Sequence, residues 1–238
     1  MSAKKTCNTI EQLKIVLKDG SIKAVSFDIF DTLLVRPAVK PTDLFILLQE
    51  KVKEITKNQK FDFYSIRLLA ESEARQKLHS VNPNYGEITL QQIYDFIARK
   101  YNLSSETANS IMEEEINLEK NLLQVRPIGM ELFELAINLK KRILIASDMY
   151  LPKESVELIL KEKGFSLFTK LYISSETKKR KDTGELYKHL LSEENLEPSE
   201  LLHIGDNEKS DFAIPTNMGI ISFYIPSNHD LFFDEESV

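Results

Sequence analysis

The sequence predicts an α/β protein with a doubly wound, mostly parallel sheet and a helical domain inserted after the first strand. Short apolar runs alternate with segments of helical periodicity in the second half of the chain, the pattern of a parallel sheet covered on both faces. Residues 37–125 carry helical patterns and almost no strand signal. With 238 residues and a hydrophobic content of 42%, the chain is long enough to bury a substantial core.

Five β-rich apolar runs are expected to form the sheet. In chain order they are Lys23–Phe27, Arg142–Ser147, Lys170–Ser174, Leu201–Gly205 and Ile220–Ile225. Helices that cover the sheet are expected at Met130–Lys141, Lys153–Lys163 and Gly184–Glu194. Ligands of such sheets bind beyond the carboxyl ends of the strands, so functional residues are expected to follow strands.

The long stretch between the first two strands is too long for a simple crossover and is interpreted as an inserted helical domain. We expect it to comprise residues 37–125, on a core made of residues 1–36 and 126–238, with hinges at Arg36-Pro37 and Arg126-Pro127. Its expected helices are Asp43–Lys53, Tyr64–His79, Leu90–Tyr101 and Ser105–Leu123, the last one capped by Ser105.

Composition excludes several classes of function. No apolar run approaches the roughly 20 residues of a membrane span, and the first eight residues lack a signal peptide's apolar segment, so we expect a cytoplasmic protein without membrane insertion. The net charge of -6 argues against nucleic acid as a partner and favours a small substrate or another protein. Cys7 is the single cysteine, which excludes an internal disulfide, and its place near the terminus argues against catalysis.

Polar residues follow four of the expected strands. Asp28 directly follows the first expected strand, and Ser147 is the last residue of the second. Lys181 follows the third strand, and the fourth strand leads into a segment with Asp206 and Asp211. Each alone has a simple structural explanation, such as a turn, a helix cap or a solvated lysine. Their joint occurrence at successive strand ends indicates a single site, because those ends meet at one edge of a parallel sheet.

These four segments, in this order, resemble the four motifs of the haloacid dehalogenase-like hydrolase superfamily. The resemblance covers nearly the whole chain when the insertion is counted as the helical cap of that family. It implies a Rossmann-like core with a cap that closes over small substrates. It also implies that Asp28 is the nucleophile, which attacks phosphorus and forms an aspartyl-phosphate that water then hydrolyses.

The resemblance further implies a Mg²⁺ site. Its ligands would be a carboxylate oxygen of Asp28, the backbone carbonyl of Phe30, and the carboxylates of Asp206 and Asp211. Hard oxygen ligands suit this ion, and its charge offsets the repulsion between a carboxylate nucleophile and a phosphate. His203 lies beside this cluster in the sequence, and the alternation along its strand predicts a packed residue rather than a ligand.

Ser147 and Lys181 are implied to hold the transferring phosphoryl group, the first through its hydroxyl and the second through its positive charge. Thr32 and Asp148, in the same motifs, are expected to contact the substrate. Competing candidates for the lysine role are Lys178 and Lys179.

Charged residues outside the four motifs are candidates for substrate selection. Arg36 is expected to bind an anion because it follows the first motif at the hinge. Arg67, Glu71 and Arg75 lie at four-residue spacing on one helical face. A solvated salt-bridge ladder is the preferred interpretation of this face, with substrate contact as the alternative.

Phe30 departs from the family pattern. In most phosphatases of the family this position holds a second aspartate, which protonates the leaving oxygen, and a phenyl ring cannot do so. Asp31 is a candidate to supply the proton, with a structural role in the turn as the alternative.

An aromatic residue at position 30 also resembles the haloacid dehalogenases, which displace halide from carbon. A metal-independent dehalogenase-type hydrolase and a non-hydrolytic module that binds a phosphosugar or a partner enzyme are therefore retained as alternatives.

Two longer strings suggest a substrate class. Phe27–Pro37 and Ser147–Pro152 resemble a subgroup of predicted bacterial hydrolases that accompany cell-surface polysaccharide synthesis. The resemblance implies a phosphorylated sugar or its nucleotide derivative as substrate and glycan-synthesis enzymes as partners. Phosphate chemistry is preferred over dehalogenation because the Asp206 and Asp211 pair suits a magnesium ion.

Overall fold

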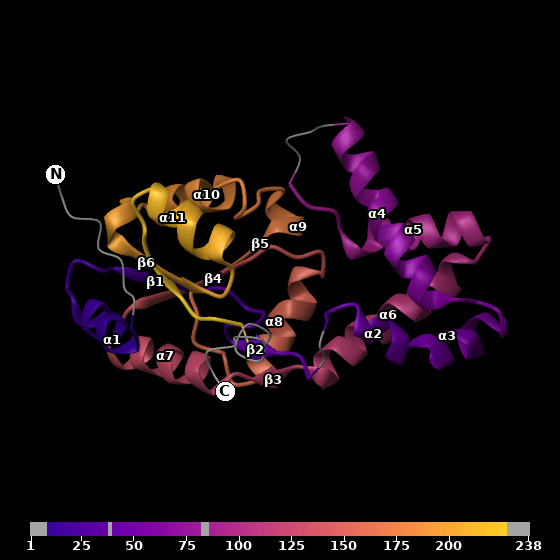
Figure 1. The fold of residues 1–238 in the computed structure, drawn as a ribbon, viewed down its shortest axis with the longest axis horizontal. Coiled ribbons are helices and arrows are strands. Elements are labelled where there is room, and N and C mark those ends of the chain that lie inside the picture. Colours follow the sequence, from indigo (N-terminus) through magenta and orange to yellow (C-terminus); the bar gives the residue numbers. More distant parts are fainter. Residues whose placement is uncertain (1–8, 38–39, 82–85, 228–238) are drawn as a thin grey trace, which may run out of the picture.

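The computed structural model describes residues 9–37, 40–81 and 86–227, and a five-stranded sheet forms its centre (Figure 1). Cys7 lies outside the described residues. The strands, in spatial order, are β5 (Lys170–Ile173), β4 (Arg142–Ser147), β1 (Ala24–Phe27), β6 (Leu201–Gly205) and β7 (Ile221–Tyr224). All neighbouring pairs are parallel, which confirms the predicted α/β fold. The strand order reverses beside β1, where a ligand crevice is expected.

Helices cover both faces of the sheet because its strands are apolar on both sides. They are α1 (Ile10–Lys18), α7 (Pro127–Asn138), α8 (Lys153–Glu162) and α10 (Glu185–Glu194). Val25 and Phe27 belong to the same apolar cluster as residues of α1, α7 and α8. Ala24 and Leu144 belong instead to a second cluster with residues of α10. Successive residues of β1 thus face opposite layers, as a parallel strand buried on both sides requires.

The inserted segment forms a helical domain beside the core, called the cap (Figure 1). Its helices are α2 (Asp43–Leu47), α3 (Gln49–Thr56), α4 (Phe63–Val81), α5 (Leu90–Tyr101) and α6 (Ser105–Leu122). Where the chain enters and leaves the cap, β2 (Leu34–Val35) pairs antiparallel with β3 (Gln124–Val125). This short ladder joins the two crossing segments beside the predicted hinges.

Four short elements complete the described chain. They are α9 (Ser174–Thr177), the 3₁₀ turn η1 (Pro198–Glu200), the π-helical turn η2 (Glu208–Ala213) and α11 (Ile214–Asn217). The π-helical turn follows β6 directly and contains Asp211. Such turns occur frequently at functional sites.

Local structure corrects several sequence-based predictions. The N-cap of α6 is Ser104, not Ser105, because the Ser104 hydroxyl accepts a hydrogen bond from the backbone N–H of Thr107 at 3.1 Å. The helix predicted for residues 43–53 is interrupted at Leu48 and forms α2 and α3. Ser174 was assigned to a strand but is the first residue of α9, and α1 was not predicted.

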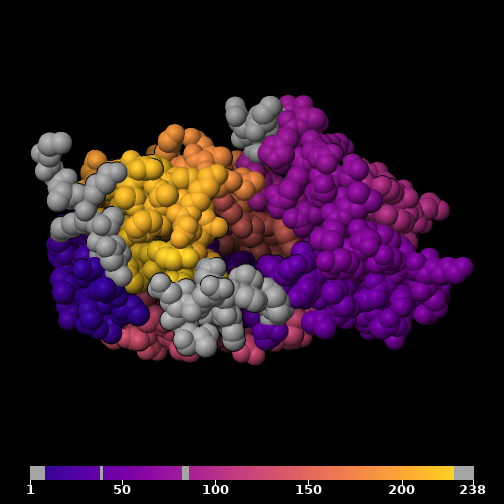
Figure 2. All heavy atoms as spheres, in the orientation of Figure 1, coloured from indigo at the N-terminus to yellow at the C-terminus, as the bar shows by residue number. Residues whose placement is uncertain are grey.

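The cap and the core enclose a hollow. In Figure 2 the surface is recessed where the yellow and orange part of the core faces the magenta helices of the cap. Within the described residues, no helix combines the length and the apolarity needed to cross a bilayer.

Candidate active site

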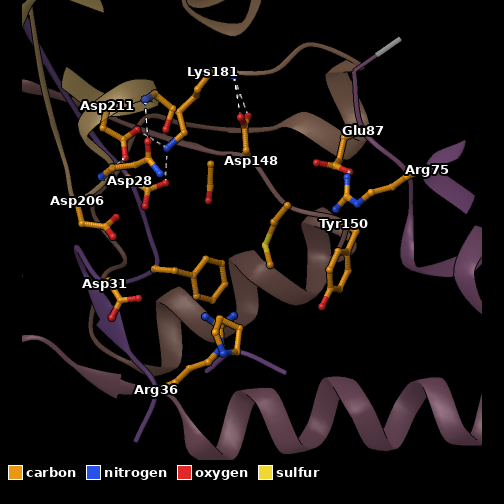
Figure 3. Close-up of a pocket in the computed structure, with 16 residues that line it drawn as sticks. Asp28, Asp31, Arg36, Arg75, Glu87, Asp148, Tyr150, Lys181, Asp206 and Asp211 are labelled. Carbon is orange, nitrogen blue, oxygen red and sulfur yellow. Dashed lines mark hydrogen bonds and ion pairs between the residues drawn. The ribbon is translucent and has the colours of Figure 1, made fainter. Parts of the chain in front are cut away.

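A cavity of about 340 Å³ lies at the carboxyl ends of β1, β4 and β6 and extends to the cap (Figure 3). Of the residues predicted for the site, those that line it are Asp28, Phe30, Asp31, Arg36, Ser147, Asp148, Lys181, Asp206 and Asp211. Thr32 is fully buried behind the wall, with its hydroxyl 3.5 Å from the Asp206 carboxylate. Segments far apart in the sequence thus meet at the topological switch point.

Asp28 lines the cavity and comes directly after β1. Its backbone N–H donates to the carbonyl of Ile204 at 2.9 Å, so the pairing between β1 and β6 continues to this residue. The side chain is buried, and burial raises the pKa of its carboxyl while the charge of Lys181 opposes that rise. A rigid strand end therefore presents one poorly solvated carboxylate to the cavity.

Lys181 joins two of the carboxylates. Its Nζ lies 2.5 Å from Asp28 Oδ1 and 2.6 Å from Asp211 Oδ1, and the residue is 2% exposed. Burial lowers the pKa of the Lys181 ammonium, but the negative charges of Asp211 and Asp28 have the larger effect. The pKa is therefore raised above its ordinary value. Lys178 instead donates to the backbone carbonyl of Ser175, and neither it nor Lys179 lines the cavity.

Asp148 and Ser147 follow β4. Both carboxylate oxygens of Asp148 accept from the backbone N–H of Lys181, at 2.9 and 3.0 Å. Asp148 was predicted to contact substrate, and its main visible effect is to hold the loop that carries Lys181. Ser147 is 1% exposed and lines the same cavity as Asp28.

Three carboxylates form a group that suits a metal ion. Asp28, Asp206 and Asp211 each offer one oxygen, and these oxygens lie within 4.8 Å of one another. Burial, followed by the charges of Asp28 and Asp211, raises the pKa of Asp206 to about 8. Hard oxygen donors crowded in this way fit Mg²⁺, because a divalent cation offsets their mutual repulsion.

The position of Asp211 depends on residues that sequence analysis did not assign to the site. His203 Nε2 lies 3.1 Å from Asp211 Oδ1, and the backbone N–H of Asn207 donates to Oδ2 at 3.1 Å. Burial raises the pKa of the Asp211 carboxyl, but the interactions with Lys181 and His203 have the larger effect. The pKa is therefore lowered below its ordinary value. A side chain at Gly205 would collide with Asp211. His203 is packed, as predicted, and it also orients a carboxylate.

Phe30 and Arg36 form a second group on the cap side of the cavity. The Arg36 guanidinium lies 4.1 Å from the centre of the Phe30 ring, within the range of a cation–π contact. Its Nε donates to Glu119 at 2.8 Å, so a carboxylate of α6 balances its charge. Arg36 was predicted to bind an anion, and it reaches the cavity as an ion pair with Glu119.

The cap residues predicted as a solvated salt-bridge ladder form a ladder, but solvent reaches only its Glu71 and Arg75 end. Glu71 lies 3.0 Å from both Arg67 and Arg75. Arg67 is fully buried and donates two hydrogen bonds of 2.8 Å to Glu115, so it stabilises the cap interior. Arg75 differs, because it lines the cavity together with Glu87 (Figure 3).

Asp206→Asn is expected to raise the melting temperature of the metal-free protein. With its pKa raised from 3.8 to about 8, the carboxyl opposes folding progressively above pH 3.8 and fully above about pH 8. Removal of this charge should raise Tm at pH 8 by a few degrees, since about 1 kcal/mol corresponds to roughly 2–4 °C in a chain of this size. The same variant should lose the further rise in Tm that Mg²⁺ causes in the wild type.

Scanning calorimetry with Mg²⁺ or with chelator measures both effects. The control is Glu208→Gln, an exposed neighbour that leaves the three carboxylates intact. A Tm of metal-free Asp206→Asn below that of the wild type would contradict the repulsion among these carboxylates.

Comparisons with known proteins agree with this fold. The family model of the haloacid dehalogenase-like hydrolases matches residues 22–215. A phosphatase structure from Thermococcus onnurineus has a TM-score of 0.59 at 19% identity, covering 87% of each chain. A 2-haloacid dehalogenase from Pseudomonas syringae pv. Tomato DC3000 has a TM-score of 0.57 at 17% identity, covering 84% of each chain. No curated protein matches the chain. At these identities the structures share the fold alone with this chain.

Proposed function

The chain belongs to the haloacid dehalogenase-like hydrolases, and from that premise we propose that it is a Mg²⁺-dependent phosphatase that acts through a phospho-Asp28 intermediate. The observation that carries the proposal is the group of Asp28, Asp206 and Asp211, whose oxygens lie within 4.8 Å of one another, with the Lys181 ammonium paired to Asp28 and Asp211. Attack of a carboxylate on a phosphate ester requires compensating positive charge. Because three carboxylates here face one ammonium, a divalent cation held by them would supply the remainder.

In the proposed mechanism a carboxylate oxygen of Asp28 attacks phosphorus, and the bond from phosphorus to the leaving oxygen breaks. Ser147 donates a hydrogen bond to a phosphoryl oxygen, and Lys181 offsets negative charge on the nucleophile and the phosphoryl group. Bound by Asp28, the Phe30 carbonyl, Asp206 and Asp211, Mg²⁺ would supply further positive charge at the reacting oxygens. Water then hydrolyses the aspartyl-phosphate and restores Asp28.

The leaving oxygen needs a proton, and we assign it to Asp31. Phe30 has no proton to donate, whereas the Asp31 side chain lines the same cavity. The Asp31 backbone has a φ of 53°, a left-handed conformation that few residues other than glycine adopt. Such conformations are retained mostly where the surrounding structure requires them, and they cluster at functional sites.

A second candidate function is a dehalogenase-type hydrolysis without metal. It is favoured by Phe30 in the cavity wall, because a halide leaves carbon as an anion and needs no proton from this position. The alternative of a binding module without hydrolysis also rests on Phe30, which cannot donate a proton.

Product release from a substrate panel separates these three functions. Phosphate release should be measured with p-nitrophenyl phosphate and sugar phosphates, in Mg²⁺ or chelator, and halide release with 2-haloacids in chelator. The phosphatase assignment requires phosphate release that depends on Mg²⁺. Halide release in chelator would establish the dehalogenase instead, and binding of a sugar phosphate without any product would indicate the binding module.

Asp31→Asn is expected to slow the hydrolysis of alkyl phosphates about 10²- to 10⁴-fold, the usual contribution of a proton donor. The hydrolysis of p-nitrophenyl phosphate should change much less, because p-nitrophenolate leaves without a proton. When Phe30→Asp is added to Asp31→Asn, part of the activity on alkyl phosphates should return, because the new carboxyl lies next to the nucleophile. Values of kcat/KM for both substrates measure these effects.

Asp95→Asn, on the exposed face of α5, is the control for the loss of a carboxylate outside the cavity. If Asp31→Asn slows both substrates equally, the residue does not donate the proton, and the structural role in the turn remains.

The substrate we favour is a sugar phosphate or a related small metabolite. The sequence resemblance to hydrolases that accompany polysaccharide synthesis supports this choice, and the size of the cavity admits a molecule of this kind. A place in the cytoplasm beside glycan-synthesis enzymes is part of the same proposal.

A further inference from the structure

The cap side of the cavity is formed by a segment that packs against the core. The backbone N–H of Leu90 donates to the carbonyl of Tyr150 at 2.8 Å. Four residues earlier, Gly86 lies so close to the backbone carbonyl of Lys178 that a Cβ atom would overlap it. Gly86 therefore permits a contact with the core that any other residue would prevent. This contact brings the following residue, Glu87, into the cavity wall.

Glu87 and Arg75 form a polar pair opposite Asp28 (Figure 3). Glu87 is 3% exposed, and its Oε1 accepts both from Arg75 Nη1 and from the backbone N–H of Ile88. Its Oε2 has no hydrogen-bond partner among the described residues. Arg75 is held on its other side by Glu71, to which Nε and Nη2 donate at 3.2 and 3.0 Å. The pair is positioned from both sides before any substrate binds.

The charges of this side of the cavity are balanced by carboxylates. Arg75 lies between Glu71 and Glu87, and Arg36 is paired with Glu119. Glu71 is shared with Arg67, which is itself paired with Glu115, so three guanidinium groups meet four carboxylates. Lys178 also acts electrostatically on Glu87, but it donates to a backbone carbonyl and does not line the cavity.

A second anionic group on the substrate would meet no unbalanced positive charge on this side of the cavity. The free-energy cost of removing its hydration would then be poorly offset. A hydroxyl group, in contrast, can donate to the carboxylate of Glu87 and accept from Arg75, as polar groups that orient ligands in a pocket do.

We propose that Glu87 and Arg75 determine specificity for the neutral, hydroxyl-bearing leaving group of a polyol monophosphate and against substrates with a second anionic group. This inference rests on the proposed phosphatase function and adds its substrate class. Glu87 accepts a hydroxyl proton of the leaving group in a hydrogen bond, Arg75 orients Glu87, and Gly86 allows the segment to reach the core.

The test compares three substrates in Mg²⁺: glucose 6-phosphate, fructose 1,6-bisphosphate and p-nitrophenyl phosphate. The wild type should prefer the hexose monophosphate to the bisphosphate by at least about tenfold in kcat/KM. Glu87→Gln should lower kcat/KM for glucose 6-phosphate by about 10- to 100-fold, as the loss of a hydrogen bond to a charged group predicts. The same variant should change p-nitrophenyl phosphate hydrolysis by less than about threefold, because this aryl group has no hydroxyl.

Glu73→Gln, on the same helix as Arg75 but outside the cavity, is the matched control. Gly86→Ala is the second variant: it should reduce the preference for glucose 6-phosphate while its circular dichroism spectrum stays native. Equal loss on glucose 6-phosphate and p-nitrophenyl phosphate in Glu87→Gln would overturn the inference, and so would a wild-type preference for the bisphosphate.

Equilibrium binding tests the specificity inference even if the proposed phosphatase function fails. If the wild type releases no phosphate from p-nitrophenyl phosphate, the phosphatase proposal fails. Calorimetric titration with glucose 6-phosphate and fructose 1,6-bisphosphate then measures the same preference without turnover. Tighter binding of the monophosphate that is lost in Glu87→Gln supports the specificity role, and equal binding to the wild type and Glu87→Gln overturns it.

Discussion

Asp28→Asn is expected to abolish Mg²⁺-dependent phosphate release, with a loss on the order of 10⁴-fold or more in kcat. The amide nitrogen and oxygen of asparagine are poor nucleophiles, and the aspartyl-phosphate can no longer form. The substitution is nearly isosteric and removes one charge beside Lys181, which retains Asp211 at 2.6 Å. The protein should therefore fold, and the effect on rate should exceed any effect on stability.

Rapid quenching of the wild type during turnover provides an independent measurement of this step. A peptide that contains Asp28 should carry one phosphoryl group, and the same peptide from Asp28→Asn should not. Substantial phosphate release by Asp28→Asn would mean that water attacks the substrate directly, and the covalent mechanism would have to be abandoned.

Lys181→Met is expected to cause the largest loss of stability among single substitutions at the site. Lys181 is the buried cation that contacts both Asp28 and Asp211, at 2.5 and 2.6 Å. Without it, two buried carboxylates face each other uncompensated. Removal of one partner of a buried ion pair typically costs about 3–5 kcal/mol, and we expect a loss of that size in the metal-free protein.

Urea denaturation with Mg²⁺ or with chelator measures this loss. A divalent cation held by the same carboxylates should restore part of the stability, since a ligand that binds only the folded state stabilises it. Lys188→Met is the control, because Lys188 forms an exposed pair with Glu185 that contributes little. If both variants have the same free energy of unfolding, the buried ion pairs do not stabilise the fold.

The fold and the composition of the central site could be predicted from local sequence patterns. Apolar strands that alternate with amphipathic helices require a parallel sheet, and polar residues that follow such strands meet at one edge. Asp28, Lys181 and Asp211 were recognised in this way from three distant segments, and the structure brings them within hydrogen-bonding distance. The periodicity of a strand or helix depends on neighbouring residues, so the sequence carries this information directly.

Helix boundaries and caps were less predictable. Ser104 and Ser105 have the same side chain, and only the backbone conformation decides which of them accepts the hydrogen bond from the first turn. The π-helical turn that carries Asp211 was not predicted, and the Asp211 carboxylate within it contacts His203, Asn207 and Gly205, residues that lie together only in the folded chain.

By itself, the sequence determined that this chain forms a doubly wound α/β core with four strand-end motifs and a long helical insertion. Only the tertiary structure decided which charged residues of the insertion reach the cavity. Arg67 and Arg75 lie on one helical face and look equivalent in the sequence, yet Arg67 is buried against Glu115 while Arg75 meets Glu87 at the cavity. The difference arises because a residue's environment depends on elements distant in the chain, here α6 and the Gly86 contact with the core, which no local pattern encodes.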